Sequence, residues 1–261
     1  MIALGIEYDG SRYVGWQRQK NGLGVQQVVE EALSSIADGP VRVSCAGRTD
    51  RGVHALEQVV SFSPTHERSP TAWVRGTNSL LPADVRVRWM RTVGESFNAR
   101  FSALQRHYRY LIYNSPVASA LFNTRVTHQP RRLSEKMMAD AGKSLLGTHD
   151  FTSYRATACQ AHSPVRTISK LAVFRSDDLI SVDVSADGFL HHMVRNIVGV
   201  LMAIGVGDQP VTWAAEVLAA KNRALGGVTA LPNGLYLVGV DYPAWKAQPV
   251  SLLPITGALG R

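Results

Sequence analysis

Residues 25–46, VQQVVEEALSSIADGPVRVSCA, place a helical pattern directly before a strand pattern. Apolar residues recur at helical spacing over 25–37, and apolar and polar residues alternate over 41–46. This stretch therefore predicts one helix followed by one strand.

Strand patterns lie on both sides of this stretch. Alternating or β-branched runs predict strands over 2–8, 56–62 and 85–89, and a further helix is predicted over 70–81. The first part of the chain thus has the order β-α-β-β-α-β.

The second part repeats this order. The predicted elements are a strand at 108–113, a helix at 133–146, strands at 165–174 and 180–185, a helix at 190–205 and a strand at 235–240, with an extra helix at 213–220. What repeats is the order of elements, not the residues themselves.

The repeated order predicts an α+β fold of two ferredoxin-like halves, each with an antiparallel sheet covered by helices on one face. We assign residues 1–104 to the first half, 105–243 to the second, and 244–261 to a C-terminal tail of unknown role. A ligand is expected in the central cleft between the halves.

The charge of the chain favours a polyanionic partner. Its 261 residues carry a net charge of +8, with 22 arginines against 6 lysines. Arginine binds phosphate through two parallel hydrogen bonds and stacks on bases, which fits RNA recognition. A compositional bias that replaces lysine by arginine throughout is the alternative explanation of this excess.

Two features point to a soluble cytoplasmic protein that does not enter a membrane. The N-terminus has no basic segment followed by a long apolar stretch, and the longest apolar run, 197–206, is too short to span a bilayer. Cys45 and Cys159 lie far apart and form no paired metal-ligand or redox spacing, so reduced thiols are expected.

The loop Gly47-Arg48-Thr49-Asp50-Arg51-Gly52-Val53-His54-Ala55 sets one carboxylate between two arginines. Its glycines allow a sharp turn that leaves room for a ligand beside Asp50, and the flanking guanidinium groups favour the ionised carboxylate. This arrangement suits a nucleophile or a base. A plain turn, with Asp50 bonded to its own backbone, is the alternative.

The chain resembles the TruA family of tRNA pseudouridine synthases over residues 2 to about 243. The motifs that carry the resemblance are the loop above, Glu7-Tyr8-Asp9-Gly10, Gly15-Trp16-Gln17, Asn98-Ala99-Arg100-Phe101-Ser102-Ala103, Tyr108-Arg109-Tyr110, His149-Asp150-Phe151, Gly188-Phe189-Leu190-His191-His192-Met193-Val194-Arg195-Asn196 and Gly234-Leu235-Tyr236-Leu237. Arg51 departs from the family pattern, where a small residue is expected, and it removes no matched group.

The resemblance implies an activity and a set of site residues. It implies isomerisation of uridine to pseudouridine at positions 38, 39 and 40 of the tRNA anticodon stem-loop, without a cofactor, by a homodimer. It further implies that Asp50 is the essential catalytic residue. Arg48 and Arg195 would bind substrate, Tyr108 would stack on the target uracil, and Leu235 would cover the base.

Ordinary structural roles compete with these assignments. A strand tyrosine such as Tyr108 is commonly half-buried and serves packing, and a strand leucine such as Leu235 normally belongs to the core. The alternative role of Arg195 is to form an ion pair at the surface. His191 and His192 fall in the predicted helix, where adjacent side chains point about 100° apart and rarely share one ion, so no metal site is expected.

Two other functions remain compatible with the sequence. A non-catalytic tRNA-binding module would use the same basic and aromatic residues, but it has no need of Asp50, which repels phosphate. Hydrolysis of the N-glycosidic bond would ordinarily need a second carboxylate, and none is evident. The role of Asp50 stays open among attack on the ribose, attack on the uracil ring and removal of a ribose proton.

Overall fold

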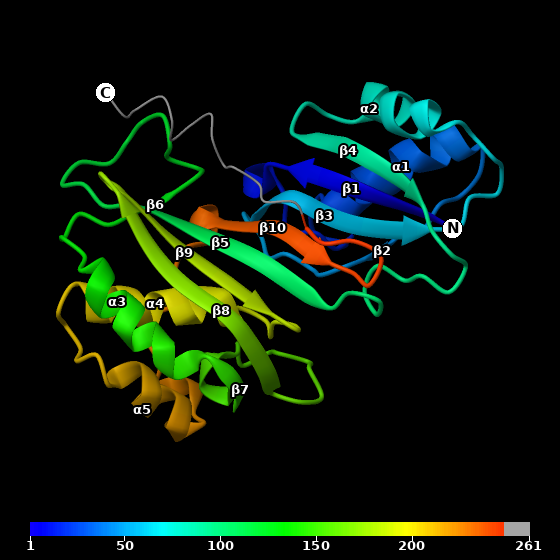
Figure 1. Cartoon of the computed structure of the whole chain (residues 1–261). Helices are drawn as coiled ribbons and strands as arrows, with labels where there is room; N and C mark the ends of the chain where they lie inside the picture. The colour runs from blue at the N-terminus through cyan, green and yellow to red at the C-terminus, as the bar shows by residue number, and fades with distance from the viewer. Residues whose placement is uncertain (248–261) are drawn as a thin grey trace.

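The computed structural model describes residues 1–247 and has an α+β fold built on one large sheet (Figure 1). Residues 248–261, which make up most of the predicted tail, lie outside the described part. The strands are β1 (Ile2–Tyr8), β2 (Ser44–Cys45), β3 (His54–Phe62), β4 (Val85–Thr92), β5 (Gln105–Tyr113), β6 (Thr127–His128), β7 (Gly147–Asp150), β8 (Val165–Ser176), β9 (Leu179–Ala186) and β10 (Leu235–Asp241).

The main path of the sheet runs in the order β4-β1-β3-β10-β5-β9-β8-β7, with β2 beside β3 and β6 beside β5. Its pairs are antiparallel except β10 with β3 and β5 with β6, which are parallel. Strand β10 comes late in the chain and lies between β3 and β5, so it joins the strands of both parts into one continuous sheet.

Helices gather at the two ends of this sheet. They are α1 (Val25–Ala37), α2 (Thr77–Leu80), α3 (Glu135–Gly142), α4 (Met193–Gly205) and α5 (Trp213–Ala220), with one π-helical segment (Ala72–Gly76) leading into α2. In Figure 1, α1 and α2 lie beside β1 and β4, whereas α3, α4 and α5 lie beside β8 and β9. The strands β3, β10 and β5 cross the space between these two groups.

Helix α4 is the most buried helix and packs closely against α3. Ile197, Leu201 and Ile204 are fully buried. A Cβ at Gly205 would lie 2.8 Å from Cγ of Met138 in α3, so a larger residue there would force neighbouring side chains to move. The packing fixes the position of α4, whose first turn carries Arg195.

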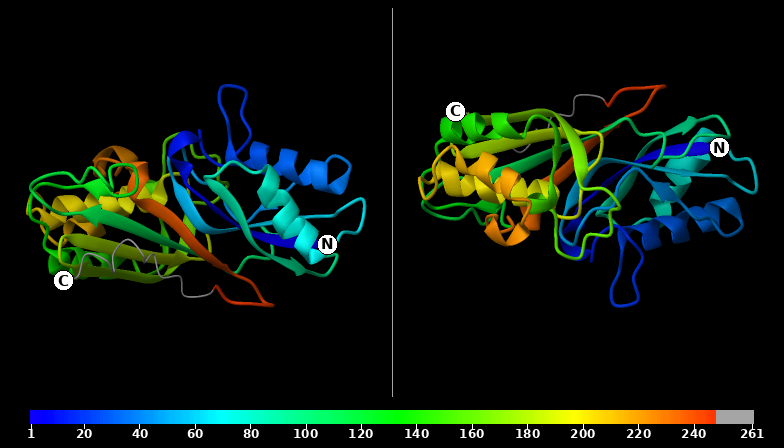
Figure 2. Two further views of the ribbon diagram at one scale, coloured as in Figure 1. Left: turned by 90° about the horizontal axis from the view of Figure 1, so that it is seen from above. Right: turned by 90° about the horizontal axis from the view of Figure 1, so that it is seen from below.

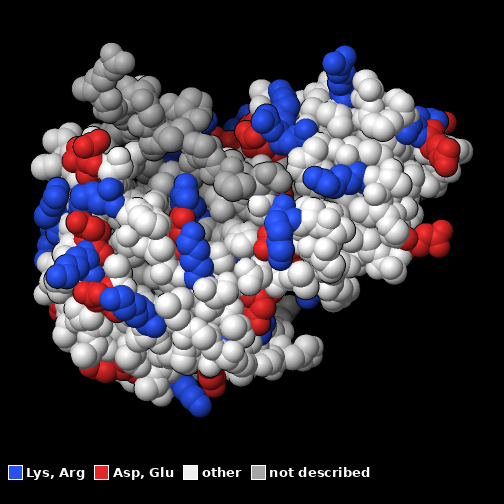
Figure 3. Space-filling model, viewed as in Figure 1, with Lys and Arg blue, Asp and Glu red and all other residues white. Residues whose placement is uncertain are grey.

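Charged side chains of both signs share the outer surface. Figure 3 shows Lys and Arg residues beside Asp and Glu residues over the face seen in Figure 1. The ion pairs of the described chain include Arg109 with Asp183 at 2.6 Å and Arg131 with Asp208 at 2.8 Å. The net positive charge is therefore not gathered into one uniform patch on this face.

One loop near the N-terminus extends away from the rest of the molecule. The segment between the 3-10 turn Gly10–Arg12 and α1 projects from the body as a loop, and it carries the exposed residues Arg18 and Lys20 (Figure 2).

Within residues 1–247, no helix has both the length and the apolar character needed to cross a bilayer.

Candidate active site

Asp50 lies in the loop between β2 and β3, and the N-terminal motifs hold the preceding residue in place. The hydroxyl groups of Tyr8 and Thr49 are hydrogen-bonded at 2.7 Å, and the Trp16 N–H donates to the Thr49 carbonyl at 3.0 Å. Gly15 has φ +111°, and a Cβ there would lie 2.7 Å from the Thr49 oxygen. The backbone that presents Asp50 therefore has little freedom to move.

A second set of contacts holds the start of the loop. The Gln58 amide donates to the Gly47 carbonyl at 2.6 Å. The Arg106 guanidinium donates to the Ala46 carbonyl through Nε at 3.2 Å and Nη2 at 3.0 Å. Arg106 also donates to the Asp187 carbonyl at 2.7 Å, so one side chain links the loop to the segment before α4.

Three nitrogen-bearing side chains from the α4 region surround the Asp50 carboxylate. Arg195 Nη1 lies 3.3 Å from Asp50 Oδ2, His191 Nε2 lies 3.5 Å from Oδ1, and His192 Nε2 lies 3.6 Å from Oδ2. The Arg195 Nε donates to the Ala230 carbonyl at 2.8 Å, which orients its guanidinium group. The Asp50 side chain keeps 21% of its surface exposed and so stays open to a ligand.

The two histidines do not lie in a helix, contrary to our prediction that they would point apart. Helix α4 begins at Met193, and His192 has the left-handed backbone with φ 62°. The His191 and His192 rings consequently lie together, with centroids 4.0 Å apart. Burial is the main cause that lowers the pKa of His192 below its ordinary value; the negative charge of Asp50 opposes this shift, and Arg195 and His191 add to it.

Tyr108 of β5 lies close enough to Asp50 for the charge of the carboxylate to act on its phenol. It is 8% exposed, and its ring meets the Phe189 ring edge-on at 5.1 Å. A Cβ on Gly47 would lie 3.9 Å from the Tyr108 hydroxyl, so the hydroxyl faces the start of the loop. Burial and the negative charge of Asp50 both raise the pKa of Tyr108 above its ordinary value, which keeps the phenol neutral.

Leu235 shares the sheet face that carries Tyr108. Strand register pairs Leu235 with Tyr110 and Leu237 with Tyr108, and directly opposed residues of an antiparallel pair point to the same side. Leu235 is 5% exposed. The next residue, Tyr236, pairs with His54 at the end of the Asp50 loop, so Leu235 begins β10 near that loop.

Arg48 differs from Arg195 in its surroundings. Its side chain is exposed, and no hydrogen bond or ion pair joins it to Asp50 within residues 1–247. The Arg48 guanidinium therefore remains available to a phosphate. Arg51 is exposed as well.

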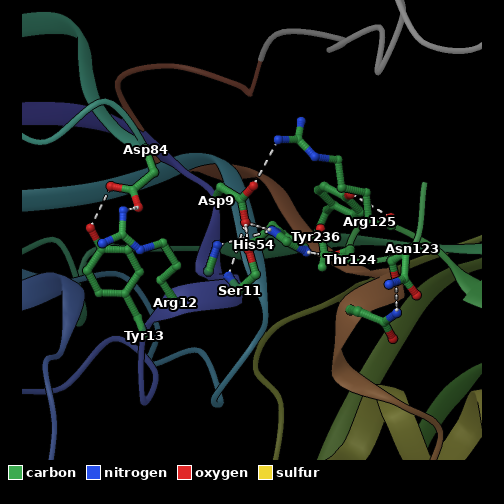
Figure 4. A network of polar contacts seen from close by, with 12 residues as sticks. Asp9, Ser11, Arg12, Tyr13, His54, Asp84, Asn123, Thr124, Arg125 and Tyr236 are labelled. Carbon is green, nitrogen blue, oxygen red and sulfur yellow. Dashed lines mark hydrogen bonds and ion pairs between the residues drawn. The ribbon is translucent and has the colours of Figure 1, made fainter. Parts of the chain in front are cut away.

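A network of polar contacts around the buried His54 side chain supports the far end of the loop (Figure 4). The His54 Nε2 lies 3.0 Å from the Thr124 carbonyl, its Nδ1 lies 3.1 Å from Asp9, and its ring stacks on Tyr236 at 4.7 Å. Arg125 contacts the same Asp9 carboxylate at 3.0 Å. The hydrogen bond with His54 is the main cause that lowers the pKa of Asp9, and burial opposes it. These partners make His54 and Asp9 supports of the loop.

Sequence reasoning missed three contributors to this site. It treated His191 and His192 only as unsuitable metal ligands, whereas both contact Asp50. It did not identify Arg106 as the anchor of the loop. The position of Arg106 in the run 106–110 was the available signal, because residues two apart in a strand share a face and Arg106 therefore shares the face of Tyr108.

Comparisons with known proteins agree on one family. A family model described as tRNA pseudouridine synthase matches residues 5–102 and 141–243. Curated relatives named tRNA pseudouridine synthase A include those of Aeromonas hydrophila, at 54% identity over 95% of this chain and 92% of the relative, and Nitrosococcus oceani, at 54% over 98% of both. The Pseudomonas aeruginosa relative is 55% identical over 93% of this chain and 85% of its own length.

A solved structure gives a much weaker match. One chain of a Cbf5-Nop10-Gar1 complex aligns with 77% of this chain and 54% of its own length, at 11% identity and a TM-score of 0.32. That similarity is too low to support a conclusion.

Proposed function

This chain belongs to the tRNA pseudouridine synthase family, and from that membership we propose that Asp50 is the carboxylate that carries out its chemistry. The chain is an isomerase that converts uridine to pseudouridine in tRNA. The observation that most strongly supports Asp50 is the position of its carboxylate. This partly exposed group lies within 3.3 to 3.6 Å of Arg195, His191 and His192, on a loop fixed at both ends.

The reaction sets what the site must do. The bond from ribose C1′ to uracil N1 breaks, the base turns, a bond forms between C1′ and C5, the C5 proton leaves and N1 gains a proton. No net oxidation or reduction occurs. An anionic carboxylate beside the nucleotide is able to attack it or to take a proton, and we assign retention of the detached base to the side chains of Tyr108 and Leu235.

We assign Arg195 to the positioning of Asp50 and of the extruded nucleotide. A uridine in a stem must leave the base stack before a side chain reaches C1′. The Ala230 carbonyl fixes Nε of Arg195, and Nη1 holds the carboxylate, which leaves the other guanidinium nitrogen for the ribose-phosphate. Arg48, exposed two residues before Asp50, is assigned to a backbone phosphate.

The ring of Tyr108 is proposed to support the uracil, with Leu235 on the same sheet face. Because Tyr108 is largely buried by its own neighbours, only a small part of the ring is open to a base. Its proposed role therefore combines packing against Phe189 with contact to the target uracil.

The target sites and the assembly follow from the family. We propose that the substrate uridines are positions 38, 39 and 40 of the anticodon stem-loop, that no cofactor or metal is needed, and that a cytoplasmic homodimer binds tRNA. We retain residues 1–104 and 105–243 as two ferredoxin-like halves whose junction, at β3 and β10, forms the cleft. Size-exclusion chromatography with light scattering tests the dimer.

Hydrolysis of the N-glycosidic bond is the competing chemistry. No second carboxylate pairs with Asp50 in the described part of the chain: the nearby Asp9 binds His54 and Arg125, and Glu7 lies 3.2 Å from Arg88. A single carboxylate favours isomerisation.

The test uses tRNA transcripts that carry one uridine, at position 38, 39 or 40, with the other two positions replaced by cytidine. Pseudouridine at each permitted position, in intact RNA and without free uracil, is the expected result. Modification only outside these positions would reject the target assignment, and release of uracil would reject isomerisation.

A further inference from the structure

The Asp50 carboxylate and the two adjacent histidines have the composition of a zinc site. Asp50 Oδ1 lies 3.5 Å from His191 Nε2, Oδ2 lies 3.6 Å from His192 Nε2, and one ligand atom from each of the three residues lies within 4.8 Å of the others. Tetrahedral zinc with bonds of about 2.0 to 2.2 Å separates its ligand atoms by roughly 3.3 Å. The two carboxylate–imidazole separations are already close to this value.

The backbone at this point explains how neighbouring residues reach one ion. A left-handed conformation is unusual for a residue other than glycine, and such strain persists where the surroundings enforce it. At His192 it turns both imidazole rings to the same side, toward Asp50, with centroids 4.0 Å apart. Residues 1–247 hold no other group of three His, Cys, Asp or Glu side chains with ligand atoms this close.

We propose that Asp50, His191 and His192 bind Zn²⁺ in the tRNA-free protein and that the bound ion blocks the enzyme reversibly. The binding rests on these three side chains alone, whereas the inhibition rests on the proposed role of Asp50. The ion takes the carboxylate that the reaction needs, so zinc acts here as an inhibitor and not as a cofactor.

Two properties of the site define this binding. Three protein ligands leave a fourth position of the ion open to water, as in zinc sites that face a ligand. Arg195 lies 3.3 Å from Asp50 Oδ2 and opposes a cation, so affinity stays below that of a structural zinc site. The partial exposure of His191, at 44%, gives the ion a path from solvent.

Calorimetric titration of ZnCl₂ into metal-free, RNA-free protein without a polyhistidine tag measures the binding directly. We expect one Zn²⁺ per chain. His191→Ala and His192→Ala should each weaken it by about 100-fold, since loss of a ligand costs at least as much as loss of a group that hydrogen-bonds a ligand. His162→Ala is the matched control. His162 is an exposed histidine, close to Cys159 in the sequence, and its replacement should not change the affinity.

Melting curves establish that each variant is folded, and the visible absorption of Co²⁺ gives a second reading of the coordination. Bands of four-coordinate Co²⁺ in the wild type, lost in both histidine variants, support the site. Absence of stoichiometric Zn²⁺ binding, or equal binding by a folded His191→Ala/His192→Ala double variant, would overturn it.

The inhibition is measured with wild-type protein and tRNA, with EDTA added afterwards. Loss of at least about 90% of the turnover at saturating Zn²⁺, restored by EDTA, is expected. If Asp50→Asn proves active while wild-type protein still binds Zn²⁺, the role of Asp50 fails and the metal site stands. If the wild type binds no Zn²⁺ while Asp50→Asn is inactive, the metal site fails and the proposed function stands.

Discussion

Arg195 Nη1 lies 3.3 Å from Asp50 Oδ2, although the two residues are 145 positions apart in the chain. The contact joins the first turn of α4 to the loop before β3, and therefore brings both parts of the chain into one site. The Ala230 carbonyl receives the Nε hydrogen bond of the same arginine, so the guanidinium plane is fixed from two sides. This geometry makes the arginine a sensitive point of the proposed mechanism.

Arg195→Ala should slow the chemical step by about 100-fold or more, as loss of a preorganised donor does elsewhere. Arg195→Lys should recover little, because lysine cannot hold Asp50 and Ala230 through one planar group. Single-turnover rates at saturating tRNA, measured beside melting curves, give the answer. A purely structural role would instead lower the melting temperature and let lysine restore the rate.

Tyr108→Phe should retain most activity, since the hydroxyl has no hydrogen-bond partner within residues 1–247 and the ring remains. Tyr108→Ala should lose far more, because base stacking is worth about 1 to 3 kcal/mol. The comparison uses kcat/KM for variants whose melting curves show them folded. An equal loss of kcat/KM in both variants would show that the hydroxyl, and not the ring, is the important group.

Gly15→Ala should destabilise the protein by about 1 to 3 kcal/mol and reduce turnover, because its left-handed backbone is strained for alanine and the new Cβ would press on the Thr49 carbonyl. Gly94→Ala is the matched control, since a Cβ there meets nothing within 4 Å. Urea unfolding and initial rates are compared for the two variants. Equal free energies of unfolding and equal initial rates in the two variants would show that the loop can shift without loss of stability or activity.

Affinity for tRNA should fall steeply as salt rises, because contacts between arginines and phosphates release counterions. Arg48→Ala should reduce the slope of log affinity against log salt by about 1, with little effect on melting, since its exposed side chain has no ion pair within residues 1–247. Filter binding at several salt concentrations measures the slope. An unchanged slope would remove Arg48 from the phosphate contacts.

Local patterns predict several elements with the bounds that the structure has, notably α1, α5 and β1. The strand predicted over 41–46 shortens to Ser44–Cys45 because side chains of α1 take the backbone donors. Ser34 Oγ accepts from the Val41 N–H at 2.9 Å, and the Glu30 carboxylate accepts from the Val43 N–H at 3.1 Å. Spacing in a sequence does not reveal such competition.

The site was predictable in its residue types and less so in its contacts. Motif resemblance selected Asp50 and Arg195, which the structure brings together. It did not reveal that His192 adopts a left-handed backbone. Because a helix was predicted over 190–205, the side chains of His191 and His192 were expected to point apart, whereas their rings lie together. The parallel pairing of β10 with β3 is likewise a long-range contact that the order of elements alone does not specify.

The most direct test of the central claim is release of tritium from tRNA labelled at uracil C5, in single turnover, by wild-type protein and by Asp50→Asn. Asp38→Asn is the matched control, because this exposed residue ends α1 in a left-handed conformation that asparagine tolerates. We expect full release by the wild type and by Asp38→Asn, and none by Asp50→Asn despite equal or tighter tRNA binding. Release by Asp50→Asn at a rate near that of the wild type would contradict this expectation.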